Sequence, residues 1–252
     1  MKTKSFILVF ALTAIIWISG RLAVNAGSAA PSAGTNQGTA SVRGKVKFVG
    51  SAPKAAPINM AADPSCAKQH PSPVLNQEVL TDANGALQNV IVYIADGLGD
   101  RKFDPPSQPA VIEQQGCMYI PHTLALQVNQ PLEVVNHDPT THNVHLVPTN
   151  NREWNKAEPP GTKVDEALPR EEVAIPVKCN VHPWMRSYVA VFKHPYFVVT
   201  GKDGSFDLSN LPPGTYTVKA WQEKLGTATQ TITVGANETK AVDFVFKSQS
   251  GS

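Results

Sequence analysis

The sequence predicts an all-β protein of sandwich or Greek-key type, and three observations lead to this prediction. Short runs in which apolar and polar residues alternate recur along the chain, as they do in strands with one buried face. No window carries a sustained helical stripe. Proline and glycine contribute 21 and 17 of the 252 residues and gather in turn signals between the runs. Regularly spaced short strands with such turns are typical of sandwiches and barrels.

The expected strands follow in chain order. Alternating patterns predict strands with one solvent-facing side at residues 45–48, 124–128, 216–220 and 242–246. Residues 89–96 (NVIVYIAD) are apolar on both sides, which predicts a central strand. Turns are expected at residues 82–85, 202–204 and 212–214. The polar, proline-rich residues 152–170 instead predict a long loop or a short helical turn between two strands.

The N-terminal residues predict export. Lys2 and Lys4 precede an apolar run from Phe6 to Ile18. Residues 24–26 (VNA) then supply the small residues that a signal peptidase accepts at the −3 and −1 positions. We therefore expect residues 1–26 to be a signal peptide, with no membrane span left after cleavage; an uncleaved anchor is the alternative. Residues 27–40 consist largely of small residues and predict a flexible leader. The expected location is the periplasm or the exterior of the cell.

Charge and motifs argue against two classes of function. The formal net charge is +2 and falls close to zero when residues 1–26 are removed, and no basic run is present. Binding to nucleic acid depends on neutralising phosphates, so we expect no nucleic-acid partner. The chain contains no G-x-S-x-G elbow, H-E-x-x-H helix, phosphate-binding loop or haem-binding C-x-x-C-H. We therefore expect that the protein is not an enzyme.

The three cysteines are expected to differ in role. Paired cysteines form disulfides under oxidising conditions, and the simplest arrangement joins Cys66 to Cys117 and leaves Cys179 free. Because His70 and His122 lie near the first two cysteines, a Cys2His2 metal site is the alternative, although its spacing matches no familiar zinc motif. A free thiol in an oxidising compartment needs a reason to persist, and metal ligation is one.

A soft metal site is predicted around KCNVHPWMRS, which contains Cys179, His182 and Met185. Two imidazoles, one thiolate and a weak thioether suit both Cu(I) and Cu(II), and this segment supplies three of the four. The fourth should come from a separate strand. An alternating strand that starts near His142 directs that ring to one face and turns His145 to the other, so His142 is the better candidate in VVNHDPTTHNVHLVP.

The pairing of NHDPTTHNVHLV with CNVHPWM resembles the blue-copper cupredoxin family, with a compact copper loop of the amicyanin or plastocyanin kind. The similarity covers residues 132–191. It implies a Greek-key cupredoxin-like sandwich that binds one type 1 copper ion through His142, Cys179, His182 and Met185. Cys179 would be the short, electronically active ligand and Met185 the long axial one. It also implies that Asn143 ties the two ligand loops together.

The resemblance further implies where electrons leave the site. In cupredoxins the Nε2 edge of the second histidine faces solvent through a small apolar patch. Pro183 and Trp184 would form this patch around His182 here, and a core position is the alternative for Trp184. His137 and His145 are expected to face solvent, with a second ion at the rim as the alternative.

Residues 199–221 (VTGKDGSFDLSNLPPGTYTVKAW) resemble the carboxypeptidase regulatory-like, transthyretin-like β-sandwich modules of exported bacterial proteins. A fainter echo, VLTDANGALQNVIVYI, begins at Val79. We therefore expect a cupredoxin-like copper domain at residues 41–194 and a second β-sandwich portion at residues 195–248. In the alternative, the N-terminal strands complete the second module, and the copper domain is set between its parts.

Taken with the resemblance, these patterns predict a periplasmic or secreted electron carrier. Its expected partner is a redox protein of the cytochrome c or dehydrogenase type. Two alternatives remain open: a protein that binds or sequesters copper without redox turnover, and an exported β-sandwich module that binds carbohydrate or protein.

Overall fold

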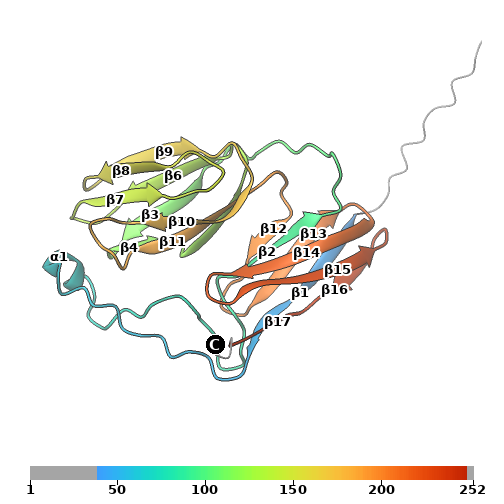
Figure 1. Ribbon diagram of the computed structural model, residues 1–252, viewed down its shortest axis with the longest axis horizontal. Helices are drawn as coiled ribbons and strands as arrows, with labels where there is room; N and C mark the ends of the chain where they lie inside the picture. Colours follow the sequence, from blue (N-terminus) through green and yellow to red (C-terminus); the bar gives the residue numbers. More distant parts are fainter. Residues whose placement is uncertain (1–38, 249–252) are drawn as a thin grey trace, which may run out of the picture. The chain divides into compact units, whose positions relative to one another are not determined.

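The computed structural model describes residues 39–248. The expected signal peptide at residues 1–26 and nearly all of the expected leader lie outside this range. Within it the regular secondary structure is almost entirely β-strand, which confirms the all-β prediction (Figure 1). The helix α1 (Pro64–Ala67) is one turn long. No helix in the described part of the chain is long and apolar enough to cross a bilayer.

The first sandwich consists of two sheets that enclose one hydrophobic core, in which Tyr119 and Ile112 are fully buried. One sheet has the order β5 (Thr123–Gln127), β11 (Arg186–Phe192), β10 (Glu172–Lys178), β7 (His142–Leu146) and β8 (Trp154–Glu158). The other has the order β4 (Met118–Ile120), β3 (Ala110–Gln115), β6 (Pro131–Asn136) and β9 (Lys163–Ala167).

The second sandwich also has two sheets around a core of its own. In one sheet β1 (Ala40–Val49) pairs with β13 (Ser205–Leu211), β16 (Thr239–Ala241) and β17 (Phe244–Lys247). The other has the order β12 (Phe197–Val199), β2 (Ile91–Asp96), β14 (Gly214–Gln222) and β15 (Gly226–Val234). β2 is therefore an interior strand, as its two apolar faces predict. Because β1 and β2 pair only with strands that follow the first sandwich in sequence, the first sandwich is inserted within the second.

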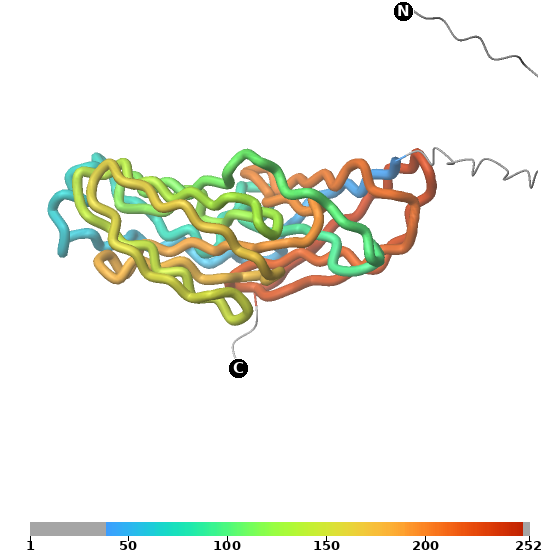
Figure 2. The backbone as a smooth tube through the Cα atoms, turned by 90° about the horizontal axis from the view of Figure 1, so that it is seen from above, coloured from blue at the N-terminus to red at the C-terminus, as the bar shows by residue number. Residues whose placement is uncertain are grey.

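The connection between β1 and β2 forms a long excursion that reaches the first sandwich (Figure 1). Its tip is the α1 loop, residues 57–75, closed by a bridge between Pro57 and Leu75. Met60 and Cys66 of this loop are buried in the core of the first sandwich. Seen from above, the cyan loop lies beside the yellow-green strands of the first sandwich (Figure 2). One segment of chain thus leaves the second sandwich, packs on the first and returns.

The expectation of a loop or helical turn at residues 152–170 is wrong, because this segment forms β8 and β9. Each strand lies at the edge of a sheet and pairs on one side only. An edge strand needs fewer apolar residues than a central one, so its sequence carries little alternation. Pro159, Pro160 and Gly161, with a φ of 74° at the glycine, occupy the turn between the two strands.

Candidate metal centre

The segment between β10 and β11 folds into a compact loop that contains three of the predicted ligands. The backbone N–H of Met185 donates to the carbonyl of His182 at 2.9 Å, and that of Cys179 donates to the carbonyl of Met185 at 3.3 Å. The N–H of His182 also donates to the sulfur of Cys179 at 3.3 Å. The loop therefore closes on itself, and Cys179, His182 and Met185 are all buried.

The fourth predicted ligand, His142, is the first residue of β7, which pairs with β10 just before the loop begins. The side-chain oxygen of Asn143 accepts a hydrogen bond from the backbone N–H of Asn180 at 2.5 Å, which confirms that Asn143 ties the two segments together. The hydroxyl of Tyr119 lies 2.5 Å from the carbonyl of Asn143 and 3.0 Å from that of Lys178, so it braces the same junction from the core side.

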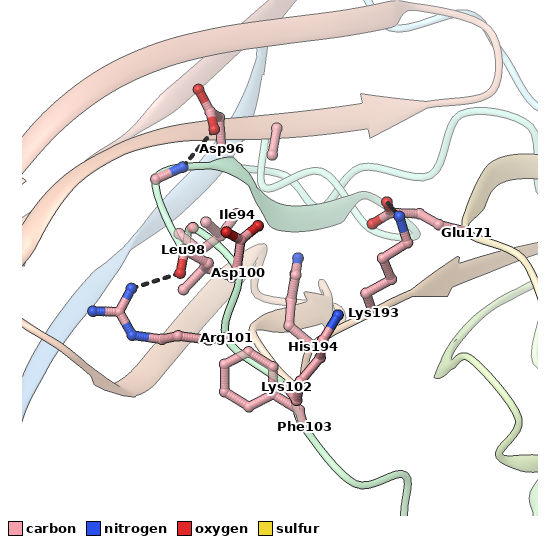
Figure 3. Close-up of a pocket in the computed structure, with 13 residues that line it drawn as sticks. Ile94, Asp96, Leu98, Asp100, Arg101, Lys102, Phe103, Glu171, Lys193 and His194 are labelled. Carbon is pink, nitrogen blue, oxygen red and sulfur yellow. Dashed lines mark hydrogen bonds and ion pairs between the residues drawn. The ribbon is translucent and has the colours of Figure 1, made fainter.

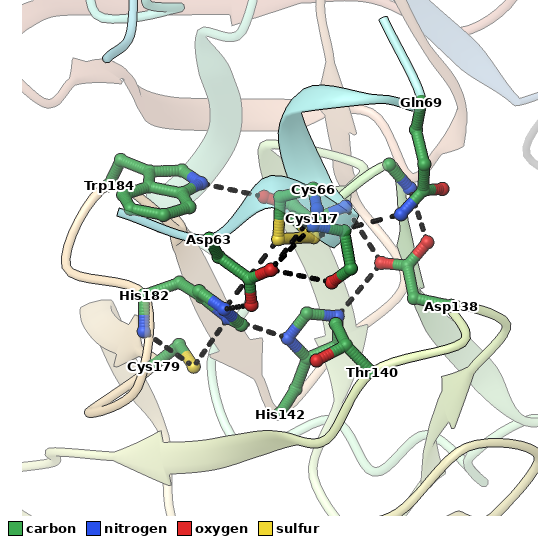
Figure 4. Close-up of a disulfide and its surroundings, with 12 residues drawn as sticks. Asp63, Cys66, Gln69, Cys117, Asp138, Thr140, His142, Cys179, His182 and Trp184 are labelled. Atoms are coloured by element: carbon green, nitrogen blue, oxygen red, sulfur yellow. Dashed lines mark hydrogen bonds and ion pairs between the residues drawn. A yellow bond between two sulfur atoms is a disulfide. The ribbon is translucent and has the colours of Figure 1, made fainter. Parts of the chain in front are cut away.

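The structure brings His142, Cys179 and His182 into one buried cluster (Figure 4). The Nδ1 atoms of the two histidines are 2.9 Å apart, and the sulfur of Cys179 is 3.8 Å from Nδ1 of His182. One ligand atom from each residue lies within 4.8 Å of the other two. The side chain of Met185 is fully buried in the same hydrophobic core as Cys179. The structure thus brings three of the four predicted ligands together and places Met185 in the same core.

A carboxylate holds the far nitrogen of each imidazole. Nε2 of His142 donates to Asp138 at 2.8 Å, and Nε2 of His182 donates to Asp63 at 2.9 Å. Asp138 also accepts from the backbone N–H groups of Gly116 and Cys117, each at 2.7 Å. With Nε2 engaged in this way, both rings direct Nδ1 toward the sulfur of Cys179. Neither carboxylate is predicted as part of the site from the sequence. Asp138, four residues before His142, carried a local signal, whereas Asp63 carried none.

Without metal, the electrostatics favour a charged pair at this site. Burial alone would lower the pKa of His142, but the hydrogen bonds to Asp138 and Cys179 outweigh it and raise that pKa to about 9. Burial would likewise raise the pKa of the Cys179 thiol, yet hydrogen bonds from His142 and the surrounding backbone leave it below its ordinary value. Because metals bind the thiolate rather than the thiol, the lowered pKa prepares Cys179 for ligation.

The disulfide between Cys66 and Cys117 is present, as expected, and it lies directly beside the cluster. The sulfur of Cys66 is 3.6 Å from Nε2 of His182. Since both cysteines are consumed in this bond, the alternative Cys2His2 site is not formed. Cys117 adopts a left-handed φ of 52°, which the hydrogen bonds from the turn to Asp138 support.

The expectation that His182 faces solvent is wrong. The α1 loop covers it, and the residue is only 1% exposed. Its Nε2 edge meets Asp63 and the disulfide, while the ring of Trp184 lies 5.0 Å away at 44°. Trp184 is itself partly buried, and its indole N–H donates to the carbonyl of Cys117 at 3.1 Å. The β1–β2 excursion therefore covers this ring, together with Trp184 of the loop between β10 and β11.

The remaining histidines lie outside the cluster. Nε2 of His145 lies 2.7 Å from the carboxylate of Glu153, on the side of β7 away from the core. His137 is exposed, as expected. His194 is 7% exposed, stacks on Phe192 and borders a polar cavity of about 280 Å³ (Figure 3). None of the four predicted ligands lines this cavity.

Comparison with protein families finds a match to part of the chain. Residues 187–247 match the model of the carboxypeptidase regulatory-like domain, which contains the segment where the sequence shows that resemblance. The match begins within β11 of the first sandwich and ends at the last residue of β17. The comparison with curated proteins finds no match.

Three similar solved structures are copper proteins by name. The copper-containing nitrite reductase NirK from Thermus scotoductus SA-01 is 17% identical, with a TM-score of 0.33. The match covers 38% of this chain and 25% of the nitrite reductase chain. A purple cupredoxin from Nitrosopumilus maritimus is 22% identical over 32% of this chain and 98% of its own, with a TM-score of 0.29. A mutant amicyanin with Cu(I) is 19% identical over 40% of this chain and 97% of its own, with a TM-score of 0.30. The chain thus spans a quarter of the nitrite reductase.

Proposed function

We propose that the protein is an exported type 1 copper protein that carries single electrons between redox partners. The observation that carries the proposal is the convergence of His142, His182 and Cys179 in one buried cluster, with their donor atoms within 4.8 Å of one another. Met185, in the same core, completes a set of two imidazoles, a thiolate and a thioether. This is the donor set that suits both oxidation states of copper.

The residues present fit a copper ion in charge as well as in type. Bound copper would supply the one-electron redox chemistry. Cys179 would provide the thiolate, whose pKa is already below its ordinary value. Asp138 and Asp63 would hold the two imidazoles in fixed orientations through Nε2. The buried position excludes bulk water from all four side chains. Residues held this firmly would move little between oxidation states, which is what electron transfer requires.

We propose electron transfer rather than catalysis because four protein donors leave no evident position for a substrate. The partner would be a redox protein of the cytochrome c or dehydrogenase type. The location would be the periplasm or the exterior, as the export signal in residues 1–26 indicates.

One observation favours a second candidate, in which the protein binds or sequesters copper without turnover. His182 is 1% exposed beneath the α1 loop, so a partner cannot touch the ring edge through which cupredoxins are expected to pass electrons. A histidine ligand covered in this way suits the storage of copper as well as slow electron transfer.

Titration of the protein with Cu(II) separates these candidates. The electron-transfer proposal expects an intense blue thiolate-to-copper band at one equivalent, together with a reversible one-electron wave in voltammetry. A colourless complex without a reversible wave would favour sequestration. Failure to bind copper at all would overturn both.

A further inference from the structure

The α1 loop gives the candidate metal centre a residue from a distant part of the chain. Asp63 lies 119 residues before His182, in the excursion that leaves β1 and returns to β2. Two constraints fix it there. The disulfide from Cys66 to Cys117 anchors α1 to the turn between β3 and β4. Met60, on the other side of Asp63, is 6% exposed in the core of the first sandwich.

The two carboxylate oxygens of Asp63 have separate partners. Oδ1 caps the start of α1, accepting from the backbone N–H of Ser65 at 2.8 Å, from its hydroxyl at 2.6 Å and from the N–H of Cys66 at 3.4 Å. Oδ2 faces Nε2 of His182 at 2.9 Å. Oδ1 already accepts two backbone N–H groups and a hydroxyl, so Asp63 acts here as a carboxylate acceptor. The proton of the hydrogen bond to Oδ2 therefore belongs to Nε2 of His182.

The position of that proton decides what the other nitrogen can do. A neutral imidazole has one N–H and one lone pair, and the partner of one nitrogen selects which is which. With Nε2 protonated, Nδ1 of His182 keeps its lone pair, and this is the atom 3.8 Å from the sulfur of Cys179. It also becomes the acceptor in the 2.9 Å contact with Nδ1 of His142. Asp138 engages Nε2 of His142 from within the first sandwich.

We propose that Asp63 is a positioning residue for the metal centre, which fixes His182 in the Nε2–H tautomer and so directs the lone pair of Nδ1 toward the metal. This inference rests on the proposed function in naming copper as the metal. It assigns a role to the inserted arrangement of the chain, because the loop between β1 and β2 of the second sandwich completes a site in the first.

Asp63→Asn is the most informative variant. Asparagine caps helices as well as aspartate does, so Oδ1 can keep its bonds to Ser65 and Cys66. Its NH2 group, however, replaces Oδ2 and sets a donor against the N–H of His182. The ring then avoids the clash by moving its proton to Nδ1, where it blocks ligation. Asp63→Ala removes both oxygens. Ser65→Ala is the matched control, because it disturbs the cap of α1 without touching His182.

The tautomer of His182 is measured first, in the metal-free chain, from the ¹⁵N shifts and two-bond couplings of the ring. Copper affinity is then measured by competition against a chelator, with circular dichroism to verify folding. We expect Nε2–H in the wild type and in Ser65→Ala, and loss of that preference in both Asp63 variants. Copper affinity should fall about 10- to 100-fold in the Asp63 variants, the usual effect of removing a partner of a metal-binding histidine.

Wild-type tautomer and affinity in both Asp63 variants would overturn the inference. So would a loss of affinity that Ser65→Ala shares, because the effect would then come from the cap of α1. The two proposals fail separately. If the wild type takes up no copper, the proposed function is wrong, while the tautomer of His182 in the metal-free variants still decides the role of Asp63.

Discussion

Glu158 lies in the interior beside the candidate metal centre and bears an unpaired oxygen. It is the last residue of β8 and the cross-strand partner of His142, and its side chain is fully buried. Its Oε2 accepts a hydrogen bond from Nε2 of Gln114, but Oε1 has no partner. The side-chain oxygen of Gln114 has none either. A glutamine at position 158 would give the pair a second donor, so that each amide could donate to the other.

The cost of this arrangement can be estimated from the pKa of Glu158. Burial raises it from 4.5 to about 7, against a smaller opposing attraction from His142. Because the folded state holds the proton more tightly than the unfolded state, the contribution of Glu158 to stability is greatest below pH 4.5. It is lost as the pH rises toward 7. A shift of this size corresponds to about 3 kcal/mol in the free energy of unfolding.

Glu158→Gln should therefore stabilise the metal-free protein at pH 8 and change little at pH 4.5, where the wild-type carboxyl is protonated. Urea unfolding in the presence of a chelator measures this difference, and we expect it to approach 3 kcal/mol at pH 8. Glu153→Gln is the control, because that side chain is 60% exposed and should alter stability by less than about 1 kcal/mol at either pH. A Glu158→Gln variant that gains nothing between pH 4.5 and pH 8 would refute the reasoning.

Three further variants test the site and the loop that covers it. Cys179→Ser should abolish the blue band, because that band requires a sulfur–copper bond, and full colour in the variant would exclude Cys179 as a ligand. Met185→Leu should retain copper but raise the reduction potential, since loss of an axial donor favours Cu(I); voltammetry showing a lower potential would contradict this. Replacing Cys66 and Cys117 with serine opens a loop of 51 residues. This should lower the free energy of unfolding by about 4 kcal/mol on the chain-entropy estimate, and equal urea midpoints would argue against it.

The parts of the site that the sequence predicts are those that local chain geometry controls. Cys179, His182 and Met185 lie within one tight loop, so their proximity follows from spacing alone. His142 could be chosen because alternation along one strand sends its neighbours to opposite faces. The disulfide could be inferred from the number of cysteines. None of these steps requires knowledge of how distant segments pack.

The features that the sequence did not reveal depend on packing between distant segments. Trp154 and Glu158 define a strand that only its pairing with β7 makes recognisable, because its exposed positions carry polar residues. Asp63 reaches His182 only because the excursion from β1 folds onto the first sandwich. No periodicity reports such a contact. The covered position of His182 follows from the same packing, which is why the residues of the loop between β10 and β11 led to the wrong expectation of an exposed edge.

The arrangement of the chain links the second sandwich to the candidate metal centre. The first sandwich supplies all four candidate ligands, yet the loop that covers His182 begins and ends in the second. This loop brings the carboxylate of Asp63 to the imidazole of His182. Its Cys66 also forms the disulfide with Cys117, in the turn whose N–H groups bind Asp138 beside His142. The loop from the second sandwich thus supplies one of the contacts that orient the candidate ligands.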